Sequence, residues 1–284
     1  MGNLRVAAAA GPFGRNLEVD FDRISRLIAR AREAGAGLLA LPEACLGGYL
    51  TSLDAPGLDG GNVAGPPALA LDGPEIARLA RLAGDLVVTA GYCELAGGYR
   101  YNSVACVTGD GVLGNHRKVH QPLSEGSSYR RGEEFTAFDT PVGRLGMMIC
   151  YDKAFPESAR SLALDGAEIV ACVSAWPASQ TNAACDLAAD RWTKRFDLFD
   201  QARALENQIV WVSANQSGTF GRLRFVASAK VVGPGGEVLA TTGAAPGMAV
   251  AELDVAAELA AARRAMGHLR NRRPETYHSG ALTR

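Results

Sequence analysis

No run of apolar residues in this sequence reaches the roughly 20 residues that a helix needs to cross a bilayer. The N-terminal stretch MGNLRVAAAAGPFG lacks the basic start and the long hydrophobic region of a secretory signal. Val6 also stands where the myristoylation pattern requires Ser or Thr. We therefore expect no membrane partner and a cytoplasmic location.

An excess of charge of either sign is also missing. The chain has 29 Lys and Arg against 30 Asp and Glu, which gives a net charge of -1 at pH 7. Because such a chain has no overall positive field to attract a polyanion, we expect no nucleic-acid partner.

Signals for metals, nucleotides and serine nucleophiles are absent as well. The six cysteines include no C-x-x-C pair, and the four histidines do not stand at zinc-site spacings from any cysteine. Scattered cysteines in a long chain without an export signal are expected to be reduced thiols. The sequence contains no G-x-x-x-x-G-K-[ST], G-x-G-x-x-G, S-x-x-K or G-x-S-x-G motif. We therefore expect no structural metal and no phosphate-binding loop, and we set aside serine amidases and α/β-hydrolases.

What the sequence does contain is an alternation of helical patterns and short β-rich runs. The chain is 48% apolar, and most of the runs are apolar on both faces, as in strands that are covered from two sides. Strands are predicted at 4–10, 37–43, 86–95, 101–108, 144–150, 168–176, 209–215, 224–234, 237–242 and 247–254. Helices are predicted at 19–35, 73–84, 155–166, 191–208 and 254–266. The alternation predicts a layered α/β fold with mixed sheets, of about ten strands and at least five helices.

No linker divides the chain, so a single domain over residues 1–266 is predicted. The loosest segment, residues 53–73, is rich in Gly and Pro and is expected to be a mobile loop near a site. The basic tail 267–284 lacks periodicity, so it either packs at a subunit interface or is partly disordered. We favour the interface.

Three ionisable residues stand where predicted strands end. LLALPE ends on Glu43, GNHRKVHQP carries Lys118 after the strand region 101–113, and LGMMICYD carries Cys150. Ligands of open α/β sheets gather at the carboxyl ends of strands, so these three side chains can converge on one site.

Cysteine chemistry gives a reason for these three residue types to act together. A thiol attacks a carbon bound to nitrogen while it loses its proton to a base, and Glu43 can be that base. A carboxylate alone would raise the pKa of the thiol, so a positive group is also needed. Lys118 would keep Glu43 ionised and would face the oxyanion, together with the backbone N–H of Tyr151. A tight turn into a helix would favour the thiolate of Cys150 further.

Structural interpretations of the same residues exist. A cysteine that ends an apolar strand is by default a small buried hydrophobe. Cys45, two residues after Glu43, either borders the pocket or is structural, and we favour the structural role. His116 and His120 flank Lys118 and allow a Cys–His dyad. We favour instead a role in supporting Lys118 or the strand end.

The segments LLALPE, HRKVHQP and GRLGMMICYDKAFPESAR resemble the three signature regions of the carbon–nitrogen hydrolase, or nitrilase, superfamily, and RALENQIVWVSANQSG and RRPETY extend the resemblance over nearly the whole chain. The resemblance implies a four-layer α-β-β-α sandwich with two mixed sheets, usually paired through its flanking helices, so a homodimer or higher homo-oligomer is expected. It implies that Glu43 is the general base, Lys118 the oxyanion stabiliser and Cys150 the acylated nucleophile, with no metal or cofactor. It also implies that Glu125 holds Lys118 and orients the substrate nitrogen.

The residues after the nucleophile are expected to select the substrate. Tyr151-Asp152 follows Cys150 as in the amidase and carbamoylase branches of the superfamily, whereas nitrilases often have Trp-Glu there. Relatives that act on carbamoyl amino acids or dicarboxylic monoamides tend to carry arginine three or four residues past the cysteine. This chain has Lys153 and Ala154 instead. A neutral or modestly polar acyl group is therefore expected, although Lys153 can still pair with an anion.

The predicted function is hydrolysis of a small linear amide through a cysteine thioester, which releases ammonia or an amine and a carboxylic acid. The alternatives are a nitrilase, an N-carbamoyl amidohydrolase, an acyl-transferring amidase and a binding protein without catalysis. The segment 177–190 either covers the pocket or builds a dimer contact. The candidates for substrate-binding residues are Tyr49, Tyr151, Lys153, Phe155 and Trp176.

Overall fold

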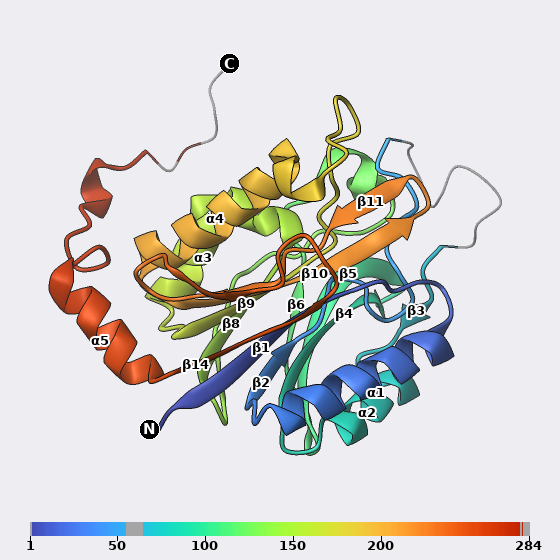
Figure 1. The fold of residues 1–284 in the computed structure, drawn as a ribbon, viewed down its shortest axis with the longest axis horizontal. Helices are drawn as coiled ribbons and strands as arrows, with labels where there is room; N and C mark the ends of the chain where they lie inside the picture. The colour runs from blue at the N-terminus through green and yellow to red at the C-terminus, as the bar shows by residue number, and fades with distance from the viewer. Residues whose placement is uncertain (1, 55–64, 279, 281–284) are drawn as a thin grey trace.

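Two β-sheets lie face to face in this structure, and helices cover both outer faces (Figure 1). The computed structural model describes residues 2–54, 65–278 and 280. The helices are α1 (Leu17–Glu33), α2 (Pro74–Ala83), α3 (Pro156–Leu164), α4 (Arg191–Asn207) and α5 (Val255–Ala265). The strands are β1 (Leu4–Gly11), β2 (Leu38–Ala40), β3 (Ala68–Leu69), β4 (Val87–Ala96), β5 (Tyr99–Thr108), β6 (Gly111–Arg117), β7 (Phe138–Thr140), β8 (Gly143–Ile149), β9 (Ile169–Ser174), β10 (Val210–Phe220), β11 (Leu223–Val226), β12 (Lys230–Val232), β13 (Val238–Thr241) and β14 (Gly247–Leu253).

The strand order is β6-β5-β4-β2-β1-β10-β9-β8-β7. In each half the central strands are parallel, namely β1, β2 and β4 in one half and β8, β9 and β10 in the other, while β5 and β6 are antiparallel. The halves join at the end of β1, where Ala10 and Gly11 pair with Asn215 and Gln216 of β10. Two mixed sheets are thus continuous through one short parallel contact.

Apolar cores lie between the four layers. Ile24 of α1 packs with the first sheet, Val104 of β5 packs with Met147 of β8 between the two sheets, and Leu162 of α3 packs with the second sheet. Strands covered on both faces explain why the strand segments are apolar without alternation.

Helix α1 shows how local sequence determines an element. The side chain of Asn16 caps the helix by accepting hydrogen bonds from the N–H groups of Glu18 at 3.0 Å and Val19 at 3.2 Å. Arginines in the last turn suit the negative end of the helix dipole. The predicted apolar stripe is buried against the sheet: Phe21, Ile24, Leu27, Ile28 and Ala31.

The predicted α/β four-layer fold with two mixed sheets is confirmed, and the five predicted helices are present. The described residues form fourteen strands, where about ten were predicted. The prediction of one strand over 224–234 is wrong, because Ala227 and Ser228 have φ of 59° and 56°, which interrupts the extended backbone between β11 and β12. The short strands β3 and β7 were not predicted, and β6 was predicted only in part, as the end of a strand region over 101–113.

The C-terminal part of the described chain leaves the sandwich through α5, which lies apart from the other helices in Figure 1. Gln208, at the end of α4, donates hydrogen bonds to the carbonyl groups of Ala262 at 2.8 Å and Met266 at 2.6 Å and so ties the end of α5 to the body. An interface role for the tail 267–284 stays a prediction. Of the predicted mobile loop 53–73, residues 55–64 lie outside the described residues.

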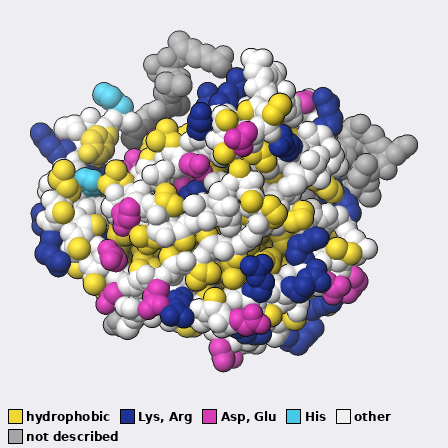
Figure 2. Space-filling model, in the orientation of Figure 1, with side chains coloured by type: hydrophobic (Ala, Val, Ile, Leu, Met, Phe, Trp, Pro, Cys, Tyr) yellow, Lys and Arg dark blue, Asp and Glu magenta, His cyan; other side chains and the backbone are white. Residues whose placement is uncertain are grey.

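Positive and negative side chains are interspersed over the face shown in Figure 2. None of the helices formed by the described residues combines the length and the apolar character needed to span a bilayer.

Candidate active site

Cys150 lies at the tight turn that follows β8. It begins a 3₁₀ turn over Cys150–Ala154, after which α3 starts at Pro156. Its φ is 50°, a left-handed conformation that is unfavourable for a residue with a side chain and that is typical of functional sites. Because the first N–H groups of such a turn have no partner within it, the turn can present donors beside the sulfur.

Asp152 holds this turn in place. Its Oδ2 accepts a hydrogen bond from the Ile149 N–H at 3.1 Å, and its Oδ1 accepts one from the His120 N–H at 2.8 Å. The rings of His116 and His120 lie beside the same carboxylate, with His120 Nδ1 2.9 Å from Oδ1. Although burial alone would raise it, contacts with both histidines lower the pKa of Asp152 to about 2. The two histidines therefore support the nucleophile turn through Asp152.

Glu43 lies in a fully buried loop after β2. The loop rests on β4 at Gly91, where a Cβ would come within 2.5 Å of the Glu43 Cα atom. Only glycine leaves room for this approach. Gln216, from the other sheet, donates to the Glu43 carbonyl group at 2.9 Å, and Asp20 of α1 accepts the Gly47 N–H at 3.0 Å. The loop is thus fixed from three sides.

Lys118 lies directly after β6, between two carboxylates. Its Nζ donates to Glu43 Oε1 at 2.8 Å and lies 2.8 Å from Glu125 Oε2. Asn102 Nδ2 bridges the same two residues, at 2.6 Å from Glu43 Oε1 and 2.7 Å from Glu125 Oε1. Tyr49 donates its hydroxyl hydrogen to Glu125 Oε1 at 2.9 Å. All these side chains are buried.

The charges of this network determine its protonation. Burial alone would lower the pKa of Lys118, but the carboxylates of Glu125 and Glu43 raise it well above its usual range. Burial raises the pKa of Glu125, and the neighbouring Glu43 adds to this while Lys118 opposes it. Lys118 therefore stays an ammonium group and remains a fixed positive charge at neutral pH.

The thiol of Cys150 lies within the electrostatic reach of this network. Burial and then the Glu43 carboxylate raise the pKa of Cys150 well above its usual range, while Lys118, Lys153 and the Ala175 N–H act in the opposite direction. The same Ala175 N–H donates to Glu43 Oε2 at 2.5 Å. A thiol with a raised pKa is protonated at rest, so it needs a base during attack.

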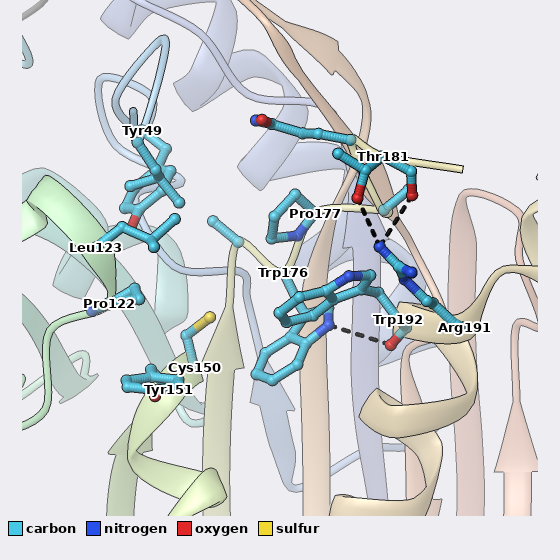
Figure 3. Close-up of a pocket in the computed structure, with 14 residues that line it drawn as sticks. Tyr49, Pro122, Leu123, Cys150, Tyr151, Trp176, Pro177, Thr181, Arg191 and Trp192 are labelled. Atoms are coloured by element: carbon cyan, nitrogen blue, oxygen red, sulfur yellow. Dashed lines mark hydrogen bonds between the residues drawn. The ribbon is translucent and has the colours of Figure 1, made fainter. Parts of the chain in front are cut away.

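A cavity of about 320 Å³ opens onto Cys150 (Figure 3). Three of the predicted substrate-binding residues line it, namely Tyr49, Tyr151 and Trp176. The segment 177–190 contributes four residues to the same wall, which favours the pocket among the two roles that the sequence left open. The remaining lining residues are Leu53, Pro122, Leu123, Ala175, Pro177, Ala178, Gln180, Thr181, Arg191 and Trp192.

Two predicted substrate-binding residues lie outside this lining. Lys153 is fully buried and donates to Asp200 Oδ1 at 2.7 Å, with its Nζ over the ring of Phe196. Phe155 stacks on His120 at a centroid distance of 3.8 Å. The structure thus places Lys153 in an internal ion pair and Phe155 against the support of the turn.

Sequence reasoning missed Asn102 and Arg191. The only feature that could have marked Asn102 as functional is its polar side chain within the apolar run YNSVACVT. Nothing in the sequence marks Arg191, because it begins a helix that is distant in sequence from Cys150. Cys45, left open as a pocket residue, is buried in the core under α1 and does not line the cavity. Among the described residues, no group of three His, Cys, Asp or Glu side chains is arranged to hold a metal ion.

Comparison with known proteins places this site in a family. A family model described as carbon-nitrogen hydrolase matches residues 5–263. The chain is 33% identical to an (R)-stereoselective amidase of Pseudomonas sp over 264 residues, which are 92% of this chain and 88% of that protein. It is 30% identical to the N-carbamoylputrescine amidase of Oryza sativa subsp. japonica over 273 residues, 90% of this chain and 87% of that protein.

A solved structure is similar over the same extent. It is a mutant of the amidase from Nesterenkonia sp. AN1 that shows covalent addition of the acetamide moiety of fluoroacetamide at its active site cysteine. The TM-score is 0.76 at 25% identity, over 96% of this chain and 94% of that chain. The chain therefore belongs to the carbon-nitrogen hydrolase family of the nitrilase superfamily, and it is a carbon–nitrogen hydrolase.

Proposed function

We propose that this enzyme hydrolyses small linear amides through a thioester on Cys150. The observation that carries the proposal is the position of Cys150. Its thiol lines the mainly apolar cavity, and the charges of Glu43 and Lys118 shift its pKa. A nucleophile at the cavity wall therefore has a carboxylate base and a permanent positive charge close enough to shift its pKa.

In the first half of the reaction, Glu43 takes the proton of the Cys150 thiol as the sulfur attacks the carbonyl carbon. Lys118 and the backbone N–H of Tyr151 stabilise the oxyanion. The intermediate collapses as the C–N bond breaks, and the leaving nitrogen takes the proton back from Glu43. Ammonia or an amine leaves, and an acyl thioester remains on Cys150.

In the second half, Glu43 takes a proton from a water molecule that attacks the thioester carbon. Collapse of this second intermediate breaks the C–S bond and releases the carboxylic acid. The sulfur then regains its proton from Glu43. Glu125 keeps Lys118 in position through their direct contact and orients the substrate nitrogen.

The cavity supports an amide whose acyl group has an apolar body. Its wall is mainly apolar and aromatic, and Lys153, a residue able to pair with an anion, is instead paired with Asp200. The similar proteins include nitrilases as well as amidases, so the preference for amides over nitriles rests on Tyr151-Asp152 after Cys150, which is typical of the amidase and carbamoylase branches.

A panel of amides, nitriles and N-carbamoyl compounds, with ammonia detection, tests this function. We expect ammonia release from amides of the panel by the wild type and by Cys185→Ala, which removes an exposed cysteine, and none from Cys150→Ala. Added hydroxylamine distinguishes hydrolysis from acyl transfer, because only an enzyme that passes the acyl group to amines accumulates hydroxamate in preference to acid. Turnover of the best amide by Cys150→Ala at the wild-type rate would refute the mechanism.

We also propose that the enzyme acts in the cytoplasm as a homodimer that pairs through α3 and α4. Large apolar side chains lie exposed on these helices, namely Leu164, Leu198 and Leu205. Light scattering coupled to size exclusion should give twice the chain mass for the wild type and a lower mass for Leu198→Asp. A monomeric wild type would contradict this assembly.

A further inference from the structure

The cavity at Cys150 holds one positively charged side chain within a lining that is mainly apolar and aromatic. Among the described residues that line it, Arg191 is the one that carries a formal charge. Trp176 and Trp192 form much of the wall beside it, and the Trp176 indole N–H is already used, since it donates to the Trp192 carbonyl group at 3.1 Å. Such a lining fits a ligand with an apolar body and a single anionic end.

The guanidinium group of Arg191 is anchored but not neutralised. Its Nη2 donates to the carbonyl oxygen of Thr181 at 2.9 Å and to its hydroxyl oxygen at 2.8 Å. Within the described part of the chain, neither Nε nor Nη1 has a hydrogen-bond acceptor and no carboxylate pairs with the guanidinium. The adjacent carboxylate of Asp190 is buried and accepts hydrogen bonds from Ser179 and from the Trp192 N–H. A guanidinium group that is fixed in place and keeps free N–H donors is well suited to bind a carboxylate in a bidentate manner.

Arg191 lies on the acyl side of the scissile bond. Glu125, which orients the substrate nitrogen in the proposed reaction, contacts the cavity through Tyr49. In Figure 3, Tyr49 and Arg191 lie on opposite sides of Cys150 and Trp176. With the leaving nitrogen toward Tyr49, the acyl group extends past Trp176 toward Arg191.

We propose that Arg191 determines specificity by binding a carboxylate at the far end of the acyl group. The inference rests on the proposed amide hydrolysis and narrows its substrate class to amides whose acyl group has a bulky apolar or aromatic body with a terminal carboxylate. The positive charge that binds the substrate carboxylate is then that of Arg191, the first residue of α4, and not that of Lys153, three residues after the nucleophile.

Matched pairs of amides test this assignment. The probes are phenylacetamide, phenylpropanamide and phenylbutanamide, each with a para-carboxylate or with the similarly shaped but neutral para-isopropyl group. For the pair that fits best, the wild type should prefer the carboxylate in kcat/KM. In Arg191→Gln the ratio of carboxylate to isopropyl should fall by about tenfold to hundredfold, the usual effect of one charge-assisted contact. Lys194→Gln, which removes an exposed positive charge from the same helix, should keep the wild-type ratio.

The outcomes separate this inference from the proposed function. Hydrolysis of both series with the same ratio in the wild type and in Arg191→Gln overturns the role of Arg191 and leaves amide hydrolysis intact. An equal fall in Lys194→Gln also overturns it, because the effect is then one of general charge. A dependence on Arg191 only when the carboxylate is moved to an N-substituent overturns the acyl-side placement. If the folded wild type hydrolyses no amide of either series or of the wider panel, the proposed function itself fails.

Discussion

Replacement of Asp152 by Asn tests whether the turn that carries Cys150 depends on one buried carboxylate. The substitution keeps the shape of the side chain and removes its charge. It also turns one acceptor oxygen into an NH₂ group, so that either the Ile149 N–H or the His120 N–H faces a donor. The link between the turn and the segment that carries Lys118 is thereby weakened.

The pKa of Asp152 gives the size of the effect. A fall of one pKa unit corresponds to about 1.4 kcal/mol in favour of the charged form, so a pKa that moves from 3.8 to about 2 represents roughly 2 kcal/mol. Because the folded-state pKa is lowered, this contribution is present at pH above 3.8 and is lost as the pH falls through about 2. If the loss acts wholly on the position of Cys150, the rate falls by about 30-fold.

Two measurements check this prediction. Urea unfolding at neutral pH should show a loss of ~2 kcal/mol for Asp152→Asn, and kcat for the best amide should fall while KM changes less. Asp110→Asn removes an exposed carboxylate from the β5–β6 turn and should leave both values unchanged. Wild-type stability and kcat in Asp152→Asn would refute the reasoning that the carboxylate positions the nucleophile.

Two further predictions concern the loop that carries Glu43. In Gly91→Ala the new Cβ meets the backbone of that loop, so kcat/KM should fall by about 100-fold or more. Gly247→Ala, whose new Cβ has its nearest neighbour at 3.4 Å, should act like the wild type. Equal activity of both variants would contradict the close approach of β4 to the loop. Burial raises the pKa of Asp20 to about 6. Between about pH 4 and 6 the folded state therefore keeps a proton that the unfolded state releases. The contribution of Asp20 to the free energy of unfolding should fall by up to ~3 kcal/mol as the pH rises over this range. Urea unfolding over this pH range should show a weaker pH dependence for Asp20→Asn in that sense, and an identical dependence in both proteins would contradict the raised pKa.

The catalytic candidates were accessible from the sequence because each stands at or shortly after the end of a strand. Cys150 and Glu43 follow the parallel strands β8 and β2, Lys118 follows the antiparallel strand β6, and each is a residue type that a thiol reaction requires. Glu125 came from the family resemblance, since nothing in its local pattern marks it. The structure brings all four residues into one buried cluster or its immediate electrostatic surroundings.

The parts that sequence reasoning did not reach depend on side-chain direction and on long-range packing. Lys153 stands three residues past Cys150, but the 3₁₀ turn directs it to Asp200 in α4 instead of the cavity. Arg191 reaches the cavity because Asp190 and Thr181 fold the segment before α4 over it. The break at Ala227 and Ser228 has no glycine to announce it, so a continuous strand was the natural prediction.

The most direct test of the mechanism is the mass of the enzyme during its first turnover. Wild type and Cys185→Ala, mixed with the best amide and quenched with acid, should each gain one acyl group, located by peptide mapping on the segment that contains Cys150. Cys150→Ala should gain none, and Lys118→Ala should acylate far more slowly. Turnover without any adduct on Cys150, or acylation of Lys118→Ala at the wild-type rate, would contradict the proposed thioester mechanism.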